Sequence, residues 1–490
     1  MSRNYFKRGI SYLKRNGIRE SFYKAAERIS RDREESSYDL IAKNSVPDEQ
    51  TLKIQREKKF ENPYKFSILV PLYETDYKML SEMLVSVGEQ TYTNWELILA
   101  DASSDDSRRN TVRDFCEDYY LQCSDSFGSI RQKVKYIYLN QNKGIAGNTN
   151  EALSNAEGDY VVLLDHDDVL SHTALFDIMW NISEREITRE NGQSNLKKIM
   201  AVYTDEDKVN SELTKYFDVH RKPDFDPILL CTNNYICHLF AVDSNIARSV
   251  GGFREEYDGA QDHDFILRCL EGLKEDQIIH IPKVLYHWRS TKSSTSENPS
   301  AKLYAYRAGK AAVEDYLVRN KIKAEVIDTA HLGFYRIVYD KLHLPVVAIS
   351  REKFDEMSEE QLSEFSQDFM IIVSDRLKPL NPLYIETMMS CMQHDFVGAV
   401  TGKILTGSGK IESAGFDIEN GESVPRFKGL NGHFSGYLHR ANLQMLVGDF
   451  SRDLVLLRKE AVVSYKPEIV LRDGYKIYYE PEAGFKRKKI

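Results

Sequence analysis

Hydrophobic runs and amphipathic stretches alternate regularly along the first third of the chain. The runs are rich in β-branched and aromatic residues, as buried strands are, and the stretches between them show the apolar spacing of helices. The expected strands span residues 66–72, 95–100, 135–139 and 160–164, and the expected helices span residues 77–90, 105–120 and 145–156. This alternation predicts right-handed βαβ units and a mainly parallel α/β sheet.

Polar residues follow the expected strands, and all of them fall on the same edge of the sheet. They are Tyr73-Glu74, Asp101, Asn142-Lys143-Gly144 and Asp165–Asp168. In open α/β sheets, ligands bind just beyond the carboxyl ends of the strands. The chain has neither a G-x-G-x-x-G nor a G-x-x-x-x-G-K-[ST] motif, so neither a dinucleotide site nor a P-loop is predicted.

The last of these strand ends carries three carboxylates within four residues, Asp165, Asp167 and Asp168. Such a cluster repels itself unless a cation neutralises it. Mg²⁺ or Mn²⁺ would bind here through one or two carboxylates together with the phosphates of a substrate. Two interpretations stand side by side: a metal–diphosphate site, and a solvated acidic turn that caps the next helix.

Composition narrows the class of protein. The chain has 490 residues and a net charge of −9, so we expect about three domains and no nucleic-acid partner. Its six cysteines include no C-x-x-C pair and read as reduced thiols. No apolar run approaches the roughly 18 residues that span a bilayer, and no signal peptide opens the chain. We therefore expect a cytoplasmic protein.

Positive charge is concentrated at the N-terminus. Residues 1–33 carry ten Lys/Arg and three acidic residues, with apolar residues at helical spacing. A basic amphipathic helix can lie on an anionic membrane, which would place the protein on the inner face of the cell membrane. It can equally pack on its own domain. Residues 34–62 read as a linker with helical pieces, so 1–62 form the first predicted segment.

Successive motifs resemble those of family-2 inverting glycosyltransferases with a GT-A fold. The resemblance runs from about residue 66 to 310. It rests on Ile68–Tyr73, Gln90–Leu97, Asp101, Asn142-Lys143-Gly144, Gly158-Asp159-Tyr160, Leu164–Asp168, Thr204–Asp207, Arg221–Phe225, Gly251–Arg254, Gln261–Asp264 and Tyr286–Arg289. Similar proteins act in O-antigen, capsule and rhamnan assembly, often with two tandem domains. One departure is Glu74, where the family usually has Asn.

The resemblance implies a set of donor-binding residues. Asp167 would be the metal ligand, with Asp165 sharing the ion or contacting the ribose, and His287 as a further ligand unless it is a packed residue. Asp101 would accept a hydrogen bond from the base. The full nucleotide-sugar set is Pro71, Tyr73, Glu74, Asp101, Asn142, Gly144, Asp165, His166 and Arg289.

An inverting transfer also needs a general base within reach of the acceptor hydroxyl. Asp262 occupies the family's base position at the start of an expected helix, where the alternative role is helix capping. Arg289 could close over the diphosphate. The residues expected to bind the acceptor are Asn234, His238, Gln261 and Trp288.

The last third of the chain resembles a damaged second copy. Residues 368–376 match residues 159–167 at an offset of 209, but Ser374 and Arg376 stand where Asp165 and Asp167 stand in the first copy. Lys466 replaces the base Asp262, and only about 20 residues separate Ile349 from Phe369. We therefore predict an active domain over 63–340 and a degenerate, non-catalytic one over 341–490. Its unpaired sheet edge would be buried against the first domain or in a homodimer.

Taken with the resemblance, these observations predict a metal-dependent hexosyl- or deoxyhexosyltransferase for cell-surface polysaccharide. The donor would be a nucleotide-diphosphate sugar, with UDP- or dTDP-sugars favoured. The acceptor would be a glycan, either lipid-linked or attached to protein. The alternatives are a non-catalytic scaffold of a polysaccharide-synthesis complex and a nucleotide hydrolase that uses the same carboxylates.

Overall fold

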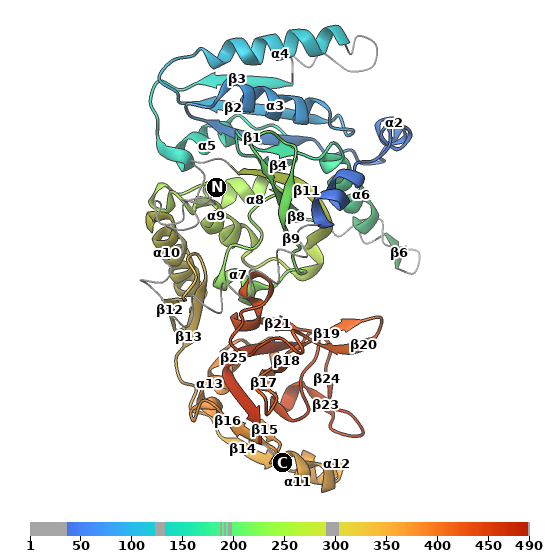
Figure 1. The fold of residues 1–490 in the computed structure, drawn as a ribbon, viewed down its shortest axis with the longest axis vertical. Helices are drawn as coiled ribbons and strands as arrows, with labels where there is room; N and C mark the ends of the chain where they lie inside the picture. The colour runs from blue at the N-terminus through green and yellow to red at the C-terminus, as the bar shows by residue number, and fades with distance from the viewer. Residues whose placement is uncertain are drawn as a thin grey trace. The chain divides into compact units, whose positions relative to one another are not determined.

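The computed structural model forms two compact units (Figure 1). It describes residues 37–122, 133–186, 189–190, 193–194, 198–290 and 303–488. The first unit, called here the N-terminal unit, runs to Phe225 and resumes over Asn234–Tyr316. The C-terminal unit contains Asp226–Asn233 and the chain from Leu317 onward. The predicted boundaries at residues 63 and 341 stay predictions.

The expected βαβ alternation is present in the N-terminal unit. Strands and helices follow in the order β1 (Phe66–Leu72), α3 (Tyr77–Gly88), β2 (Trp95–Asp101), α4 (Arg108–Gln122), β3 (Val134–Tyr138), α5 (Gly144–Ser154) and β4 (Tyr160–Leu163). Asp76 caps α3 by accepting hydrogen bonds from the N–H groups of Lys78 and Met79. The strands lie in the order β3-β2-β1-β4 and all pair in parallel. Their carboxyl ends therefore share one edge.

Beyond β4 the sheet becomes mixed, which the sequence pattern did not show. The order continues β4-β10-β8-β11-β5, with β9 beside β8. The bounds are β5 (Val169–Leu170), β8 (Ala201–Asn210), β9 (Tyr216–His220), β10 (Phe240–Asp243) and β11 (Ile278–Ser290). The helices in this part are α6 (Ala174–Glu186), α8 (Ser244–Ser249), α9 (Gln261–Leu270) and α10 (Leu303–Arg319), with the short pair β6 (Arg189–Glu190) and β7 (Gln193–Ser194).

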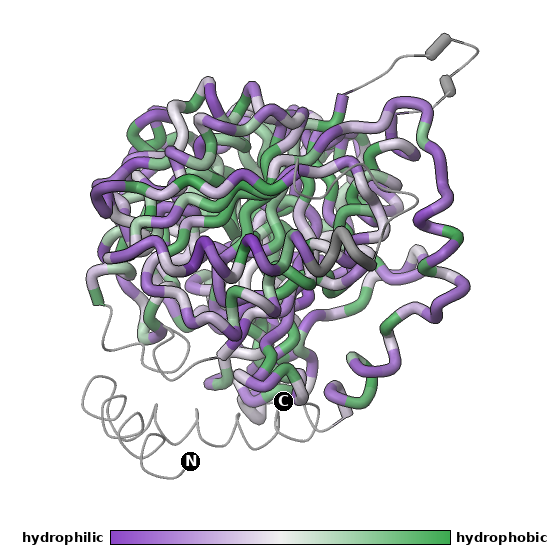
Figure 2. Tube along the Cα trace, turned by 90° about the horizontal axis from the view of Figure 1, so that it is seen from above, coloured by the Kyte–Doolittle hydropathy of each residue, from purple (hydrophilic) through white to green (hydrophobic). Residues whose placement is uncertain are grey.

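The core of the N-terminal unit lies along this sheet. All seven residues of β2 are buried, and in β1 only Pro71 is not. Parallel strands covered on both faces are apolar throughout, which is why they read as continuous hydrophobic runs in the sequence. Figure 2 shows hydrophobic residues gathered along such strands. This rigid base holds the loops at the carboxyl edge.

The C-terminal unit has a second sheet with a related strand order. It runs β14-β15-β22-β17-β25-β16, with β18 beside β17 and β21 beside β25. The bounds are β14 (Val346–Ser350), β15 (Phe369–Val373), β16 (Leu377–Pro379), β17 (Val397–Leu405), β18 (Ile411–Ala414), β21 (Met445–Val447), β22 (Leu454–Arg458) and β25 (Lys476–Arg487). Among the described residues, β14 pairs only with β15.

Smaller elements complete the C-terminal unit. They are the hairpins β12 (Ala324–Asp328) with β13 (Tyr335–Tyr339), β19 (Phe416–Glu419) with β20 (Glu422–Pro425), and β23 (Val462–Ser464) with β24 (Val470–Leu471), and the helices α7 (Pro227–Thr232), α11 (Arg351–Glu356), α12 (Glu359–Ser363) and α13 (Tyr384–Ser390). Helix α7 comes from the middle of the chain and packs on β13 and β21. Asp226 caps it and also accepts a hydrogen bond from the N–H of Leu446 on β21 (2.7 Å).

The predicted basic amphipathic helix over residues 1–33 lies outside the described residues. Within the predicted linker, residues 37–44 are helical, and so is α2 (Glu49–Glu57). Among the helices that the structure describes, none is long and apolar enough to cross a membrane.

Candidate active site

The acidic turn between β4 and β5 is held in place by strand β11. Asp168 is fully buried, and its two oxygens accept hydrogen bonds from the Tyr286 hydroxyl (2.5 Å) and the N–H of Arg289 (2.6 Å). Burial and the negative charges of Asp167 and Asp165 raise the pKa of Asp168 well above its ordinary value. The solvated, helix-capping turn that the sequence also allowed is therefore not what forms at Asp168.

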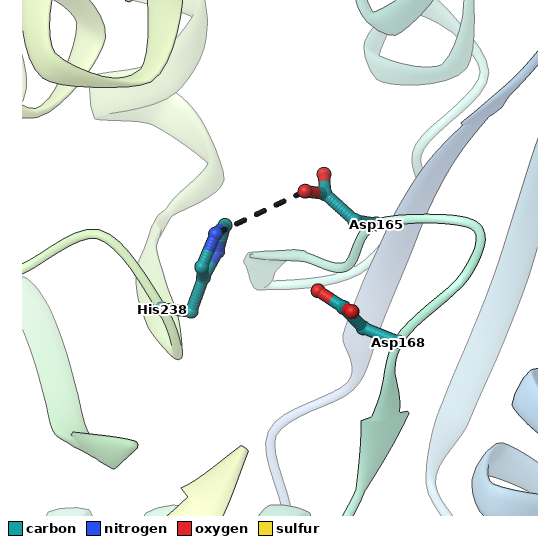
Figure 3. A group of neighbouring side chains, drawn as sticks. All are labelled: Asp165, Asp168 and His238. Carbon is teal, nitrogen blue, oxygen red and sulfur yellow. Dashed lines mark ion pairs between the residues drawn. The ribbon is translucent and has the colours of Figure 1, made fainter. Parts of the chain in front are cut away.

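Asp165, Asp168 and His238 form a group that could hold a metal ion (Figure 3). Each offers one ligand atom, and these atoms lie within 4.8 Å of one another. The His238 Nε2 is 3.9 Å from Asp165 Oδ2. Burial raises the pKa of Asp165, the imidazole of His238 opposes this, and Asp167 and Asp262 raise it further. Carboxylates that repel one another in a buried place are stabilised by a bound cation.

His238 carries a second sign that this group suits a ligand. Its Nδ1 is buried and has no hydrogen-bond partner among the described residues. Its ring stacks on Tyr286, with 4.5 Å between ring centroids, so the same tyrosine that holds Asp168 also orients the imidazole. Carboxylate oxygens with an imidazole nitrogen fit Mn²⁺ and, with fewer nitrogen ligands, Mg²⁺. From the sequence, His238 was expected to bind the acceptor, and that role stays a prediction.

The other two predicted metal ligands lie outside this group of three. His287 Nδ1 is 2.6 Å from Asp207 Oδ1, and Tyr38 donates a hydrogen bond to the other oxygen of Asp207 (2.6 Å). A carboxylate that binds one imidazole nitrogen commonly orients the ring for metal binding through the other nitrogen. Asp167 lies in the same turn and raises the pKa of Asp165. Their roles as metal ligands stay predictions.

Arg289 has a different setting from the one the sequence suggested. Its side chain is fully buried, and it donates hydrogen bonds to the backbone oxygens of Asp167 (2.5 Å) and Ser211 (3.0 Å) and to Glu82 (2.5 Å). These contacts fasten the acidic turn to α3 and to the β8–β9 hairpin. Its Nη2 has no hydrogen-bond partner among the described residues, so one donor is available to a ligand.

Asp262, the predicted base, lies in the first turn of α9 but does not cap it. The N-cap is Ala260, which makes no side-chain cap. Asp262 Oδ2 instead accepts a hydrogen bond from Asn234 Nδ2 (2.7 Å), and the Cys237 thiol lies 3.6 Å away. The capping alternative is therefore not observed. Asn234, predicted to bind the acceptor, holds the Asp262 carboxylate instead; the role of Asp262 as the base stays a prediction.

Two further residues of the predicted acceptor set lie near this centre. Gln261 precedes Asp262, and its side-chain oxygen accepts a hydrogen bond from the N–H of Gly259 (2.8 Å). Trp288 is partly buried, and its ring lies edge-on to His238, with 6.1 Å between centroids. The Lys208 ammonium lies 5.5 Å from the centroid of the same ring. Contact of either residue with an acceptor stays a prediction.

Asp101 sits at the carboxyl end of β2, where the sequence placed the nucleotide base. It is fully buried and accepts hydrogen bonds from the N–H of Ser103 (2.9 Å), the Ser103 hydroxyl (2.5 Å) and Tyr136 (2.6 Å). Tyr73 lies exposed at the end of β1, after the half-buried Pro71. An exposed ring beside a buried carboxylate suits a base, which needs stacking and a hydrogen-bond acceptor.

The Glu74 departure from the family pattern has a structural role here. Glu74 has φ +49° and accepts a hydrogen bond from the N–H of Ser104 (2.8 Å), which with the partly exposed ion pair to Arg108 (3.0 Å) lowers its pKa. Its own N–H donates to the Ser103 hydroxyl (2.9 Å). Glu74 thus joins the loop after β1 to the loop after β2.

Thr75, the next residue in the chain, has a buried side-chain oxygen with no hydrogen-bond partner among the described residues.

The Asn142-Lys143-Gly144 turn leads into α5. Asn142 Oδ1 accepts from the N–H of Gly144 (3.0 Å) and from Asn148 (3.0 Å). Gly144 has φ +78°, and a Cβ there would lie 2.2 Å from Asp258 Oδ2, so only glycine fits. Asp258 accepts a hydrogen bond from the N–H of Ala146 (3.0 Å), so this carboxylate occupies the N-terminus of α5.

In the acidic turn between β4 and β5, His166 Nδ1 is buried and has no hydrogen-bond partner among the described residues.

Comparison with known proteins finds a match for the part of the chain that carries the acidic turn. Residues 67–186 match the family described as glycosyl transferase family 2. This match includes Asp165, Asp167 and Asp168, whereas His238 and Asp262 lie beyond it. An uncharacterized protein, y4gI, from Sinorhizobium fredii is 36% identical over 293 residues, which are 60% of this chain and 30% of that protein. The O-antigen biosynthesis protein RfbC from Myxococcus xanthus is 28% identical over 284 residues, 58% of this chain and 20% of that protein.

The chain therefore spans less than a third of the length of these two relatives. Among solved structures, Staphylococcus aureus TarS 1–349 in complex with UDP aligns at 19% identity with a TM-score of 0.35, covering 51% of this chain and 65% of that one. The match of residues 67–186 to this family and the α/β sheet confirm the expected family of that segment and the expected fold class.

Some residues of this site were not singled out from the sequence. Tyr286 lies in a quoted motif, but its contact with Asp168 joins residues 118 apart. Tyr38 and Asp207 are 169 apart, and nothing in the local sequence around Tyr38 indicates that contact. Asp205, Glu206 and Asp207, from the quoted motif Thr204–Asp207, are all buried, so they do not form a solvated acidic turn.

Proposed function

We propose that the chain is a metal-dependent inverting glycosyltransferase that moves a sugar from a nucleotide-diphosphate donor to a hydroxyl of a glycan. The observation that carries this proposal is the convergence of two groups at one sheet edge. The cluster of Asp165, Asp168 and His238 suits a cation, and Asp262 lies near enough to raise the pKa of Asp165. A cation site beside a carboxylate base is the minimum that such a transfer requires.

The negative charges of the acidic turn support the proposed binding of a metal ion and a nucleotide-diphosphate donor. Asp165, Asp168 and His238, with Asp167 and His287 as the predicted alternatives, would hold Mg²⁺ or Mn²⁺. When bound, the ion would stabilise negative charge on the leaving diphosphate. Tyr286 and Arg289 keep the turn in place, while Asp101, Tyr73 and Glu74 line the carboxyl ends of the strands where a nucleotide base would bind.

On the acceptor side, Asp262 is proposed to take the proton. One carboxylate oxygen is held by Asn234, which fixes the side chain and leaves the other oxygen for the acceptor hydroxyl. As that hydroxyl oxygen bonds to the anomeric carbon, the bond from carbon to the diphosphate oxygen breaks, and Asp262 receives the hydroxyl proton. Attack from the face opposite the leaving group inverts the configuration. Trp288 and Gln261 remain the proposed acceptor contacts.

The C-terminal unit is proposed to be non-catalytic. At the offset of 209, Asp165 and Asp167 correspond to Ser374 and Arg376. Arg487 there pairs with Glu412 (2.5 Å) and with Asp453 (2.5 Å), and Lys488 donates to the backbone oxygen of Asp375 (2.6 Å). Arg487 thus pairs with two carboxylates, and a second cationic side chain lies at the turn that contains Asp375.

The biological setting is proposed from the relatives and the family. The O-antigen biosynthesis relative supports a role in cell-surface polysaccharide synthesis. The proposed donor is a UDP- or dTDP-sugar, and the proposed acceptor is a glycan that is either lipid-linked or attached to protein. A cytoplasmic protein in peripheral contact with the membrane would meet both substrates. A homodimer remains part of this proposal, because β14 has no neighbour on its outer side among the described residues.

A donor screen tests the proposed function. The purified chain would be incubated with UDP-, dTDP- and GDP-sugars, with Mg²⁺, Mn²⁺ or EDTA, while nucleoside diphosphate release and melting temperature are followed. We expect one donor class to be hydrolysed slowly with metal and to raise the melting temperature. Turnover undiminished in EDTA would contradict metal dependence. Absence of both turnover and stabilisation with every donor would favour the scaffold alternative.

A further inference from the structure

The segment Asn234–His238 joins the two halves of the proposed active site. At one end, Asn234 donates to Asp262, and its own oxygen accepts from the N–H of Cys237 (3.1 Å). At the other end, the His238 ring faces Asp165. Cys237, between them, has φ +40°, a conformation that a non-glycine residue keeps only when its surroundings impose it. The placement of this short segment therefore decides where both the base and the cation site lie.

A single buried lysine holds the segment. The Lys222 side chain is fully buried, and its ammonium donates to the backbone oxygens of Ile236 (2.6 Å) and His238, the two residues that flank Cys237. It also pairs with Glu206 (3.3 Å), whose same oxygen accepts from the N–H of His238 (3.1 Å). One ion pair thus binds three backbone groups of a five-residue segment.

Further contacts hold both members of this ion pair. His220 Nδ1 lies 3.2 Å from the other carboxylate oxygen of Glu206. The carboxylate next to it, Asp205, accepts a hydrogen bond from the backbone N–H of Lys222 (2.9 Å), which fixes the lysine's own position. A charge-assisted bond to a carbonyl in a buried place is stronger than a neutral one.

We propose that Lys222 is a positioning residue for the reaction: it fixes the segment Asn234–His238, and with it the orientation of Asp262 and of His238. The inference rests on the proposed function for the chemical roles of these two groups. Lys222 touches neither substrate nor metal ion in this assignment. It acts through the backbone of the segment, with Glu206 as its counter-ion.

The test uses the full chain and two readouts. Lys222→Met alone removes the lysine partner of the buried Glu206 and leaves His220 beside it. The matched variant is therefore the double substitution Lys222→Met with Glu206→Gln, which removes both charges and nearly preserves shape. Lys133→Met is the control, because this lysine also donates to a backbone oxygen, that of Thr93 (2.5 Å), but at β3, away from the segment.

The first readout is alkylation of Cys237 with iodoacetamide, resolved by peptide mass spectrometry. We expect the double variant to react about tenfold faster or more, because the segment opens more often once its anchor is lost. Cys116 and Cys269, which are buried elsewhere in the N-terminal unit, serve as internal references and should not change. The Lys133→Met control should label like wild type.

The second readout is the split between donor affinity and turnover. With the donor found in the screen and a saturating concentration of metal ion, which offsets a weakened His238 ligand, we expect kcat to fall about tenfold or more in the double variant. Nucleotide affinity should stay within about twofold under these conditions, because Asp262 acts in the transition state rather than in nucleotide binding. Labelling as slow as wild type would overturn the inference, and so would faster labelling with an unchanged kcat. If the wild type transfers no sugar, the proposed function fails, and labelling alone then decides whether Lys222 fixes the segment.

Discussion

The two sheets of this chain share one framework and differ in chemistry. In the N-terminal unit the strands run β1-β4-β10-β8-β11-β5, and in the C-terminal unit they run β14-β15-β22-β17-β25-β16. Each neighbouring pair has the same relative direction in both sheets: parallel, antiparallel, antiparallel, parallel, antiparallel. Among the described residues, the second sheet has no counterpart of β3 or of β2, the strand that ends at the proposed base-binding residue Asp101.

The registers of the two sheets also correspond residue by residue. His287 pairs with Val169 on β5, and Lys486 pairs with Lys378 on β16, where residues 169 and 378 are related by the same offset of 209. A lysine therefore stands where the first sheet has a candidate metal ligand. The comparison teaches that packing requirements preserve a sheet after the charged residues at its edge have been replaced, because the core depends on apolar contacts and the site does not.

The largest expected effect is a loss of turnover on mutating the acidic turn of the N-terminal unit, compared with the corresponding turn of the C-terminal unit. Asp165→Asn keeps the shape of the side chain but removes a charge from the cation group, so metal-dependent donor turnover should fall by about 10²–10³-fold. Asp375→Ala in the C-terminal unit should leave turnover within a few-fold of wild type. Steady-state nucleotide release with Mn²⁺ measures both. Equal losses in the two variants would break the comparison.

The second prediction concerns the base position. Asp262→Asn should lower transfer by about 10²–10⁴-fold with donor affinity nearly intact, because a general base acts in the transition state. Lys466→Ala, at the corresponding place in the C-terminal unit, should change neither. Product formation and nucleotide titration would be measured on the same preparations. Weakened donor binding with normal saturated turnover would give Asp262 another role.

The third prediction sharpens the metal assignment within the N-terminal unit. His238→Gln should weaken Mn²⁺ binding by about 10–100-fold if His238 is a ligand, whereas Asp207→Asn should act only through His287 and have a smaller effect. Isothermal titration of the metal into each variant distinguishes them. A larger loss in Asp207→Asn would favour the set of Asp167 and His287.

The last prediction is a pH dependence of the C-terminal unit, outside the proposed active site. Burial raises the pKa of Asp226 to about 6, so its neutral form is favoured in the folded state. The stabilisation that this provides is complete below the ordinary pKa of an aspartate and is lost as pH rises through about 6, a change of about 3 kcal/mol. Urea unfolding of wild type and Asp226→Asn, compared from pH 4 to 7, measures it. Parallel stability curves would contradict the prediction.

Part of the fold followed from the sequence because its signals are local. Strand β2 and helix α3 appear as a hydrophobic run and a capped amphipathic stretch, and the acidic turn falls at a strand end. The change to a mixed sheet after β4 could not be predicted, since the direction of β10 depends on which strand it pairs with. Arg289 was expected to lie over the diphosphate. Its burial could not be predicted, because it depends on α3 and the β8–β9 hairpin, which lie far from Arg289 in the chain.

The sequence by itself predicted the α/β class, the family that residues 67–186 match, Asp165 and Asp262 as candidate site residues, and Ser374 and Arg376 at the corresponding positions near the C-terminus. Only the tertiary structure decided that His238 lies with Asp165 and Asp168, that Asn234 donates to Asp262, and that Lys222 donates to the backbone of the segment between them. It also decided that α7 belongs to the C-terminal unit. The physical reason is that periodicity and capping act between near neighbours, whereas hydrogen bonds between buried groups depend on how distant segments pack.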